Sequence, residues 1–244
     1  MKTVKLSVLI SALFLLVGFN VNAQNATTIL KKMDDVMFSA KDQSATEKII
    51  LTDKDGSIRT REATIKQKGN SMRLFRFVKP ASQAGISILS LPNDVMYLYM
   101  PAFGKVRRIS SSVKSQNFAG TDFSYDDMES KPYSEKYTSK LLKTEAGDFV
   151  LQLIPKSKRS AYSKIIVTVD KINGYPVKME FYDRGNKKFK VADYQFKKIG
   201  KYWNASVITM TNLKKHHQTK MIMSSVKYDQ GLSDEDFTVR KLEQ

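Results

Sequence analysis

The fold is decided by residues 93–128, which read NDVMYLYMPAFGKVRRISSSVKSQNFAGTDFSYDDM. The stretch begins with an apolar segment at 95–100, in which successive side chains point to opposite faces of a strand. A Pro and Gly turn follows, then the adjacent Arg107 and Arg108, a Ser and Lys run, and an aromatic and acidic segment at 118–128. This order contains no recognisable catalytic motif and predicts a strand and a lid that enclose something apolar.

Strand-like alternation continues on both sides of this stretch. Turn signals such as Asn173-Gly174 separate the alternating segments. The predicted strands are 45–52, 57–67, 71–78, 85–91, 95–100, 105–110, 133–144, 149–154, 164–170, 175–183, 188–196, 202–212 and 218–228. An amphipathic helix is predicted before them at 25–39, with Ile29 and Met33 on its apolar side and Asp34 on the opposite side. Residues 24–244 should therefore form one mainly β domain, a meander of antiparallel strands behind one helix.

Many of the predicted strands are apolar on both faces. Met221 and Met223 share one face while Ile222 lies on the other, and Phe181 is followed by Tyr182 in the same way. A sheet with one face in water should alternate cleanly. Two-sided burial indicates a strongly curved sheet with one face on helices or a cavity. Methionine suits an adaptable apolar surface, and ordinary core packing is the alternative explanation of these methionines.

The first residues have the pattern of a signal peptide. Lys2 and Lys5 precede an apolar run at 6–19, and Val21-Asn22-Ala23 resembles a cleavage site. The pattern predicts a signal peptide at 1–23, cleaved after Ala23; an uncleaved anchor is the alternative, although the run is short for a bilayer span. The chain has no cysteine, which excludes a lipid-modified N-terminus, disulfides and cysteine metal sites.

The chain is strongly basic, with a formal net charge of +17 and a pI near 9.8. Nucleic acid is the usual partner of such a charge, but the predicted export argues against it. An anionic membrane surface is the better candidate. Lysines spread over outward strand faces, where they discourage edge-to-edge aggregation, are the alternative explanation.

Histidine chemistry is not expected. His216 and His217 are adjacent, so on a strand they point to opposite faces and cannot serve one metal ion or one nucleophile. We therefore predict surface histidines, no enzymatic activity, no metal and no cofactor.

The acidic residues of the decisive stretch have a structural interpretation. Ser124 and Asp127 fit a capping box, which predicts a short lid helix that ends before Pro132. The same segment could meet the arginines across the loop, which gives a candidate lid latch of Arg107, Arg108, Asp122, Asp126 and Asp127. Paired carboxylates could instead serve glycoside chemistry or bind calcium, and we consider these readings weaker.

The motifs together resemble a known family. They are Arg76-Phe77, Pro80, Gly85-Ile86-Ser87-Ile88-Leu89, Tyr97-Leu98-Tyr99-Met100-Pro101, Arg107-Arg108-Ile109 and Phe118-Ala119-Gly120-Thr121-Asp122-Phe123-Ser124-Tyr125-Asp126-Asp127. In order and spacing they are similar to the LolA-like outer-membrane lipoprotein-sorting proteins, and more narrowly to the branch that accompanies RND-type exporters. The resemblance implies a periplasmic, half-open antiparallel β-barrel with an N-terminal helix and short lid helices.

The resemblance also implies a function and partners. The implied function is a carrier that shields the acyl chains of lipids or lipoproteins for transfer toward the outer membrane, without catalysis. The alternative is an RseB-like protein-binding or sensing module that acts as an accessory of an RND-type exporter. The partners would be acyl chains, with an inner-membrane RND-type transporter or an outer-membrane acceptor, and the protein would be a monomer. The residues expected near the apolar cavity are Ile86, Ile88, Met96, Leu98, Met100, Phe123, Met179, Phe181, Met221 and Met223.

Overall fold

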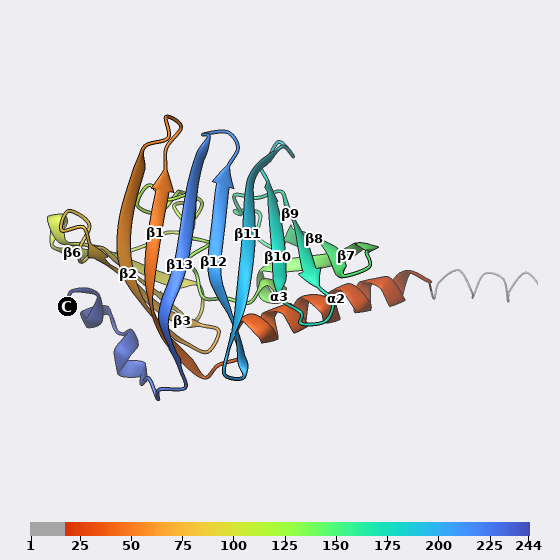
Figure 1. The fold of residues 1–244 in the computed structure, drawn as a ribbon, viewed down its shortest axis with the longest axis horizontal. Helices are drawn as coiled ribbons and strands as arrows, with labels where there is room; N and C mark the ends of the chain where they lie inside the picture. The colour runs from red at the N-terminus through yellow and green to blue at the C-terminus, as the bar shows by residue number, and fades with distance from the viewer. Residues whose placement is uncertain (1–17) are drawn as a thin grey trace, which may run out of the picture.

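A computed structural model describes residues 18–244, with side chains from Asn25 onward. Thirteen strands form one antiparallel sheet in the order β6-β5-β4-β3-β2-β1-β13-β12-β11-β10-β9-β8-β7, and the sheet curves without closing (Figure 1). The strands are β1 Asp42–Thr52, β2 Ile58–Lys68, β3 Met72–Lys79, β4 Ser87–Leu91, β5 Val95–Met100, β6 Lys105–Arg108, β7 Tyr137–Thr144, β8 Asp148–Pro155, β9 Lys164–Asp170, β10 Pro176–Tyr182, β11 Lys188–Ile199, β12 Tyr202–Asn212 and β13 His217–Tyr228. The predicted half-open barrel is confirmed, and each predicted strand has its counterpart.

The sheet is a meander with one long-range pairing. Within β1 to β6 and within β7 to β13, each strand pairs with its neighbour in sequence. The two halves are joined in the middle of the sheet by β1 and β13, where Glu47 lies opposite Met223 and Ile49 opposite Met221. The edges of the sheet are therefore β6 and β7, whose connection at 109–132 crosses the open side.

The helix α2, Gly18–Met37, packs against β7, β12 and the short helix α3, Tyr133–Lys136. It is longer than the predicted 25–39 and begins earlier, and the predicted signal peptide otherwise falls on residues outside those that the structure describes. Its buried side includes Ile29 and Met33, as predicted. No helix in the described part of the chain is long and apolar enough to cross a membrane.

Asp34 differs from the prediction. The sequence pattern placed it on the solvent side, yet it is buried and accepts hydrogen bonds from the backbone N–H groups of Tyr133 and Ser134, both at 2.8 Å. Burial raises the pKa of Asp34, while those N–H donors lower it. This contact turns 133–136, which were predicted as strand, into the short helix α3.

The core lies on the inner face of the sheet. Ile165, Val167, Met179 and Phe181 are buried there. Their outward neighbours, such as Ile166, are only half-buried. The curved sheet therefore has one fully buried face along β8 to β10, and its second face is covered only locally.

The outer face of β3 to β5 is covered by the C-terminal segment, which contains the 3-10 helices η2, Asp234–Phe237, and η3, Val239–Leu242. Phe237 and Leu242 pack on Leu74 and Leu89. Tyr97 and Tyr99 join this outer cluster, whereas Met96 and Leu98 face the inner core, which matches the predicted faces of β5. In Figure 1 the segment lies beside β2 and β3. This cover explains why β3 to β5 are apolar on both sides.

The part of the connection between β6 and β7 that precedes α3, which we call the lid loop (residues 109–132), contains no helix. The predicted capping contacts exist, since the Ser124 hydroxyl donates to Asp127 at 2.8 Å and the Asp127 N–H donates to the Ser124 hydroxyl at 3.2 Å. They close a turn instead of starting a helix. The predicted lid helix at 124–127 is therefore wrong, and Ser124–Asp127 stabilise a loop.

Candidate functional site

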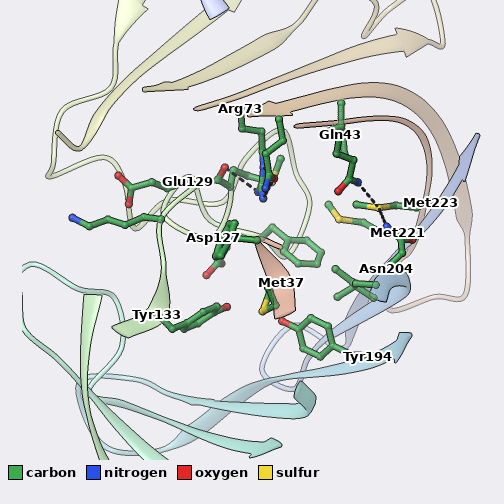
Figure 2. Close-up of a pocket in the computed structure, with 18 of the residues that line it drawn as sticks. Met37, Gln43, Arg73, Asp127, Glu129, Tyr133, Tyr194, Asn204, Met221 and Met223 are labelled. Carbon is green, nitrogen blue, oxygen red and sulfur yellow. Dashed lines mark hydrogen bonds between the residues drawn. The ribbon is translucent and has the colours of Figure 1, made fainter. Parts of the chain in front are cut away.

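A cavity of about 170 Å³ opens between the inner face of the sheet, the end of α2 and the lid loop. Figure 2 shows Met37, Met221, Met223, Tyr133 and Tyr194 around a common space, with Arg73 on another side of it. Its further lining comes from the sheet and the lid loop, and includes Ile65, Phe75, Phe123, Phe181, Phe196, Trp203, Ala205, Ile208 and Met210. Aromatic and thioether groups form a large share of the walls and are suited to a flexible apolar ligand, and charged and polar side chains also line the cavity.

The predicted cavity residues divide into two groups. Phe123, Phe181, Met221 and Met223 line the cavity. The others lie outside its lining: Ile88, Met96 and Met179 are buried in the core, Ile86 and Leu98 pack against that core, and Met100 is half-buried at the end of β5. Strand alternation placed the methionines of β13 on one face, and both line this cavity, whereas Met96 of β5 and Met179 of β10 pack in the core.

One end of the cavity is polar. Arg73 donates from Nε and Nη2 to Oε1 of Gln67, at 3.0 and 2.6 Å, and from Nη1 to the carbonyl of Met128 at 3.5 Å. Burial lowers the pKa of Arg73, and the nearby Glu47 carboxylate raises it. Arg73 thus ties the lid loop to the sheet across the cavity wall.

Glu47 lies in the same wall. Its side chain is 2% exposed, and its Oε2 has no hydrogen-bond partner. Burial raises the pKa of Glu47 to about 7, against the opposing effect of Arg73. Among the described residues no ion pair forms between these two side chains, so Arg73 acts on Glu47 through space.

Charged pairs surround the cavity where the lid loop meets α3. Lys114 bonds Glu129 at 2.7 Å, and Lys136 bonds Asp126 at 3.0 Å. Glu129 and Lys136 are themselves 3.5 Å apart. These side chains are largely shielded from solvent, so breaking one partner would leave a poorly hydrated charge. The Lys114–Glu129 pair joins two parts of the lid loop, and Lys136 attaches this end of the loop to α3.

The middle of the lid loop is bound to the sheet by two buried cations. Arg61 donates to the carbonyl of Ala119 at 2.6 Å, and Lys190 donates to the carbonyl of Asp122 at 2.6 Å. Burial lowers the pKa of Lys190, while Asp127 and Asp122 raise it. Phe118, the residue before Ala119, packs on Phe77 with ring centroids 5.5 Å apart. Polar and aromatic contacts therefore close the lid loop together.

Asp122 has partners that the sequence did not indicate. Its carboxylate, 1% exposed, accepts a hydrogen bond from the Thr219 hydroxyl at 2.8 Å and lies 2.5 Å from Nδ1 of His217. His217 Nε2 is 3.4 Å from Asp53. The prediction of two surface histidines is correct for the exposed His216 and wrong for His217, which connects the lid loop to β13 and the β1–β2 turn.

The predicted latch arginines do not hold the lid loop. Arg107 and Arg108 are exposed, and Arg107 lies over the ring of Phe103 at 5.8 Å. The carboxylates predicted to meet them bind elsewhere: Asp122 to His217, Asp126 to Lys136 and Asp127 to Ser124 and the Tyr162 hydroxyl. The acidic half of the predicted latch therefore exists. In place of the predicted arginines, Asp122 pairs with His217, which is 95 residues away, and Asp126 pairs with the nearby Lys136. Strand alternation alone predicts neither pair.

Tyr162 completes this arrangement. Its hydroxyl donates to both carboxylate oxygens of Asp127, at 3.0 and 2.8 Å. Burial raises the pKa of Tyr162 well above its usual range, and the Asp127 charge adds to the effect. The phenol therefore stays protonated and acts as a fixed donor. Each carboxylate of the lid loop has a structural partner, and the cavity lies beside Asp126, Asp127 and Glu129.

The comparisons with known proteins agree with this geometry. A family model described as "Uncharacterized protein" matches residues 69–244. A crystal structure from Vibrio parahaemolyticus, described as an outer membrane lipoprotein-sorting protein domain, is 32% identical, covers 91% of this chain and 100% of its own, and superposes with a TM-score of 0.86. None of the curated proteins matches the chain.

Two further crystal structures share the fold. A DUF1329 family protein from Desulfovibrio piger is 24% identical over 91% of this chain and 99% of its own, with a TM-score of 0.84. A LolA superfamily protein from Nitrosomonas europaea is 24% identical over 88% of this chain and 98% of its own, with a TM-score of 0.76. The same curved sheet therefore recurs along almost the full length of all three solved structures.

Proposed function

Because this chain belongs to the LolA-like family of outer-membrane lipoprotein-sorting proteins, we propose that it carries acyl chains in its cavity. The cargo would be a lipid or a lipoprotein, moved through the periplasm toward the outer membrane without any reaction. The signal peptide expected at 1–23, removed after Ala23, would bring the protein there. The observation that carries the proposal is the cavity of aromatic and methionine side chains beneath a lid loop held by polar contacts.

The energetics of transfer support a carrier. Each methylene that moves from water into an apolar cavity stabilises the complex by about 0.8 kcal/mol, so ten methylenes contribute about 8 kcal/mol. Without such a cavity this free energy opposes the passage of an acyl chain through water. The cavity volume of about 170 Å³ is below the roughly 300–1,000 Å³ of common ligand sites. A long acyl chain therefore requires the lid loop to move outward. The contacts of Arg73, Arg61 and Lys190 to carbonyls of that loop are among those that opening would break.

The direct test is native mass spectrometry of the mature protein isolated from the cell envelope. We expect bound species with the masses of acylated molecules, released on unfolding. A matched pair of variants tests the site: Ala205→Phe fills the cavity, and Ile172→Phe adds the same ring at an exposed position. The first should lose the bound species and the second should keep them.

The same preparation tests the RseB-like alternative. If the protein is always empty, binds no fatty-acyl probe and crosslinks in the envelope to one dominant protein such as a transporter, the carrier proposal is wrong and the binding-module reading replaces it. Bound acyl molecules that disappear in Ala205→Phe support the carrier.

A further inference from the structure

Two buried oxygen atoms in the cavity wall lack hydrogen-bond partners. One is Oε2 of Glu47, whose side chain is 2% exposed, and the other is Oδ1 of Asn204, 4% exposed. Both residues line the cavity. A buried acceptor without a donor is costly, and native structures rarely keep one without a reason. Two of them in one wall indicate that something else supplies the donors.

Glu47 and Asn204, which carry the two oxygens, both lie beside Met223. Glu47 and Met223 are paired residues of β1 and β13, so their side chains share the inner face. Asn204 reaches the same methionine from β12, with its Nδ2 3.6 Å from the Met223 sulfur. Figure 2 shows Asn204 and Met223 next to each other at the cavity wall. We call Glu47 and Asn204 the acceptor pair.

Several donors around the acceptor pair already have partners. Arg73 bonds Gln67 and the Met128 carbonyl, and Nε2 of Gln43 lies 3.7 Å from the Met223 sulfur. Nδ2 of Asn204 donates to the Tyr228 hydroxyl at 2.9 Å. A phosphate or carboxylate at this point would find these donors occupied and would face an acidic side chain. The acceptor pair therefore selects against an anionic group.

We propose that the acceptor pair binds a hydrogen-bond donor on the cargo. This donor is a neutral hydroxyl or amide N–H group, or a cationic ammonium group, attached to the acyl chain. The inference rests on the proposed function and adds to it the polar chemistry of the cargo. The aromatic and methionine walls cover the chain, and the acceptor pair fixes where its polar end lies. A hydroxylated lipid and an N-acylated one both present this chemistry.

The protonation state of Glu47 should make the binding of the cargo depend on pH. With burial raising the pKa of Glu47 to about 7, the carboxyl group is largely ionised at pH 8 and largely protonated at pH 6. The carboxylate only accepts hydrogen bonds. A donor on the cargo should therefore bind more tightly at pH 8 than at pH 6.

Calorimetric titration with 1-decanol and decyl methyl ether tests the inference, because the two probes have the same chain and differ in the hydroxyl donor. We expect the unmodified protein to bind decanol at least about tenfold more tightly than decyl methyl ether, because decanol can donate a hydrogen bond to a buried charged acceptor. Glu47→Met and Asn204→Leu should each reduce this ratio severalfold, and an unchanged circular dichroism spectrum should show that the variants are folded. The control is Gln43→Met, which alters the same wall without removing an unpartnered oxygen and should keep the ratio.

The outcomes separate the inference from the proposed function. If the unmodified protein binds both probes equally, or if neither variant of the acceptor pair changes the ratio, the inference is wrong while carriage of acyl chains stands. If neither probe binds at all, both are wrong. A ratio that falls in both variants, persists in Gln43→Met and grows from pH 6 to pH 8 supports the acceptor pair.

Discussion

The buried Glu47 carboxylate lowers the free energy of unfolding of the ligand-free protein by an amount that depends on pH. Burial raises its pKa to about 7 from an ordinary value of 4.5. Between these two values the folded state binds more protons than the unfolded chain, so the contribution of Glu47 to the free energy of unfolding falls as pH rises through this window. The loss is complete above pH 7 and amounts to about 3 kcal/mol.

Glu47→Gln removes this titration. We expect the variant to be more stable than the unmodified protein at pH 8, by up to about 3 kcal/mol, and to show little of that advantage at pH 4.5. Urea unfolding of the ligand-free proteins across this range measures the difference. A stability difference that stays constant with pH would contradict the assignment.

At the scale of residues, the sequence located the methionines of β13 and missed the polar groups. Strand alternation places Met221 and Met223 on one face, and the structure puts both at the cavity. Glu47 lies at an inward position of the same kind, but a charged residue in an alternating segment normally reads as solvent-facing. Its inward direction follows from the register of β1 with β13, which local pattern does not specify.

The lid loop is held in place by contacts with distant segments of the chain. The contact made by His217 can be removed by a single substitution. His217→Ala leaves the buried Asp122 with Thr219 as its remaining side-chain partner among the described contacts. We expect a loss of about 1–3 kcal/mol in stability. Hydrogen exchange should become faster at 117–124, where the Asp122 N–H donates to the Thr219 hydroxyl.

The neighbouring histidine provides the control. His216 is exposed and has a positive φ of 52°, a conformation that Asn tolerates. His216→Asn should therefore leave stability and exchange nearly unchanged. Equal effects from the two variants would show that His217 does not hold the lid loop.

At the scale of elements, strands were easier to predict than the segments that cross the open side. Alternation and turn residues are local signals, and β5, β9 and β12 begin and end where they were predicted. The short helix α3 was missed because its first N–H groups are satisfied by Asp34, about 100 residues earlier in the chain. A capping box looks the same in sequence whether it begins a helix or, as at Ser124, closes a turn.

The C-terminal segment joins the last residues to the outer face of the first half of the sheet. Phe237 and Leu242 are buried there, and Lys66 bonds Asp236 at 2.6 Å. Phe237→Ala should cost about 3–5 kcal/mol and Leu242→Ala about 2–5 kcal/mol, because both leave cavities in the outer cluster.

Val239 supplies the comparison, because it lies in η3 and is 39% exposed. Val239→Ala should cost well under 1 kcal/mol. Chemical denaturation of the three variants checks the set. Similar small losses in all three would mean that the C-terminal segment contributes little to the stability of the sheet.

At the scale of the whole molecule, the meander and its curvature could be inferred, and the pairing at its centre could not. Hairpin turns connect each strand with the next, and two-sided apolar strands indicated a curved sheet with a covered face. The pairing of β1 with β13 joins segments from the two ends of the domain and has no local signal. The cover of the outer face by the C-terminal segment depends on that pairing as well.

The central position of β1 and β13 also sets the timing of assembly. The strand made first and the strand made last lie side by side, so their pairing closes a loop of almost the whole domain, and such closure is entropically costly and slow. During synthesis β1 can pair with β2 at once, while its other edge waits for β13. An unpaired edge invites another chain to bind in place of the missing strand. Until the end of the chain has emerged, β1 therefore remains an open template for mispairing.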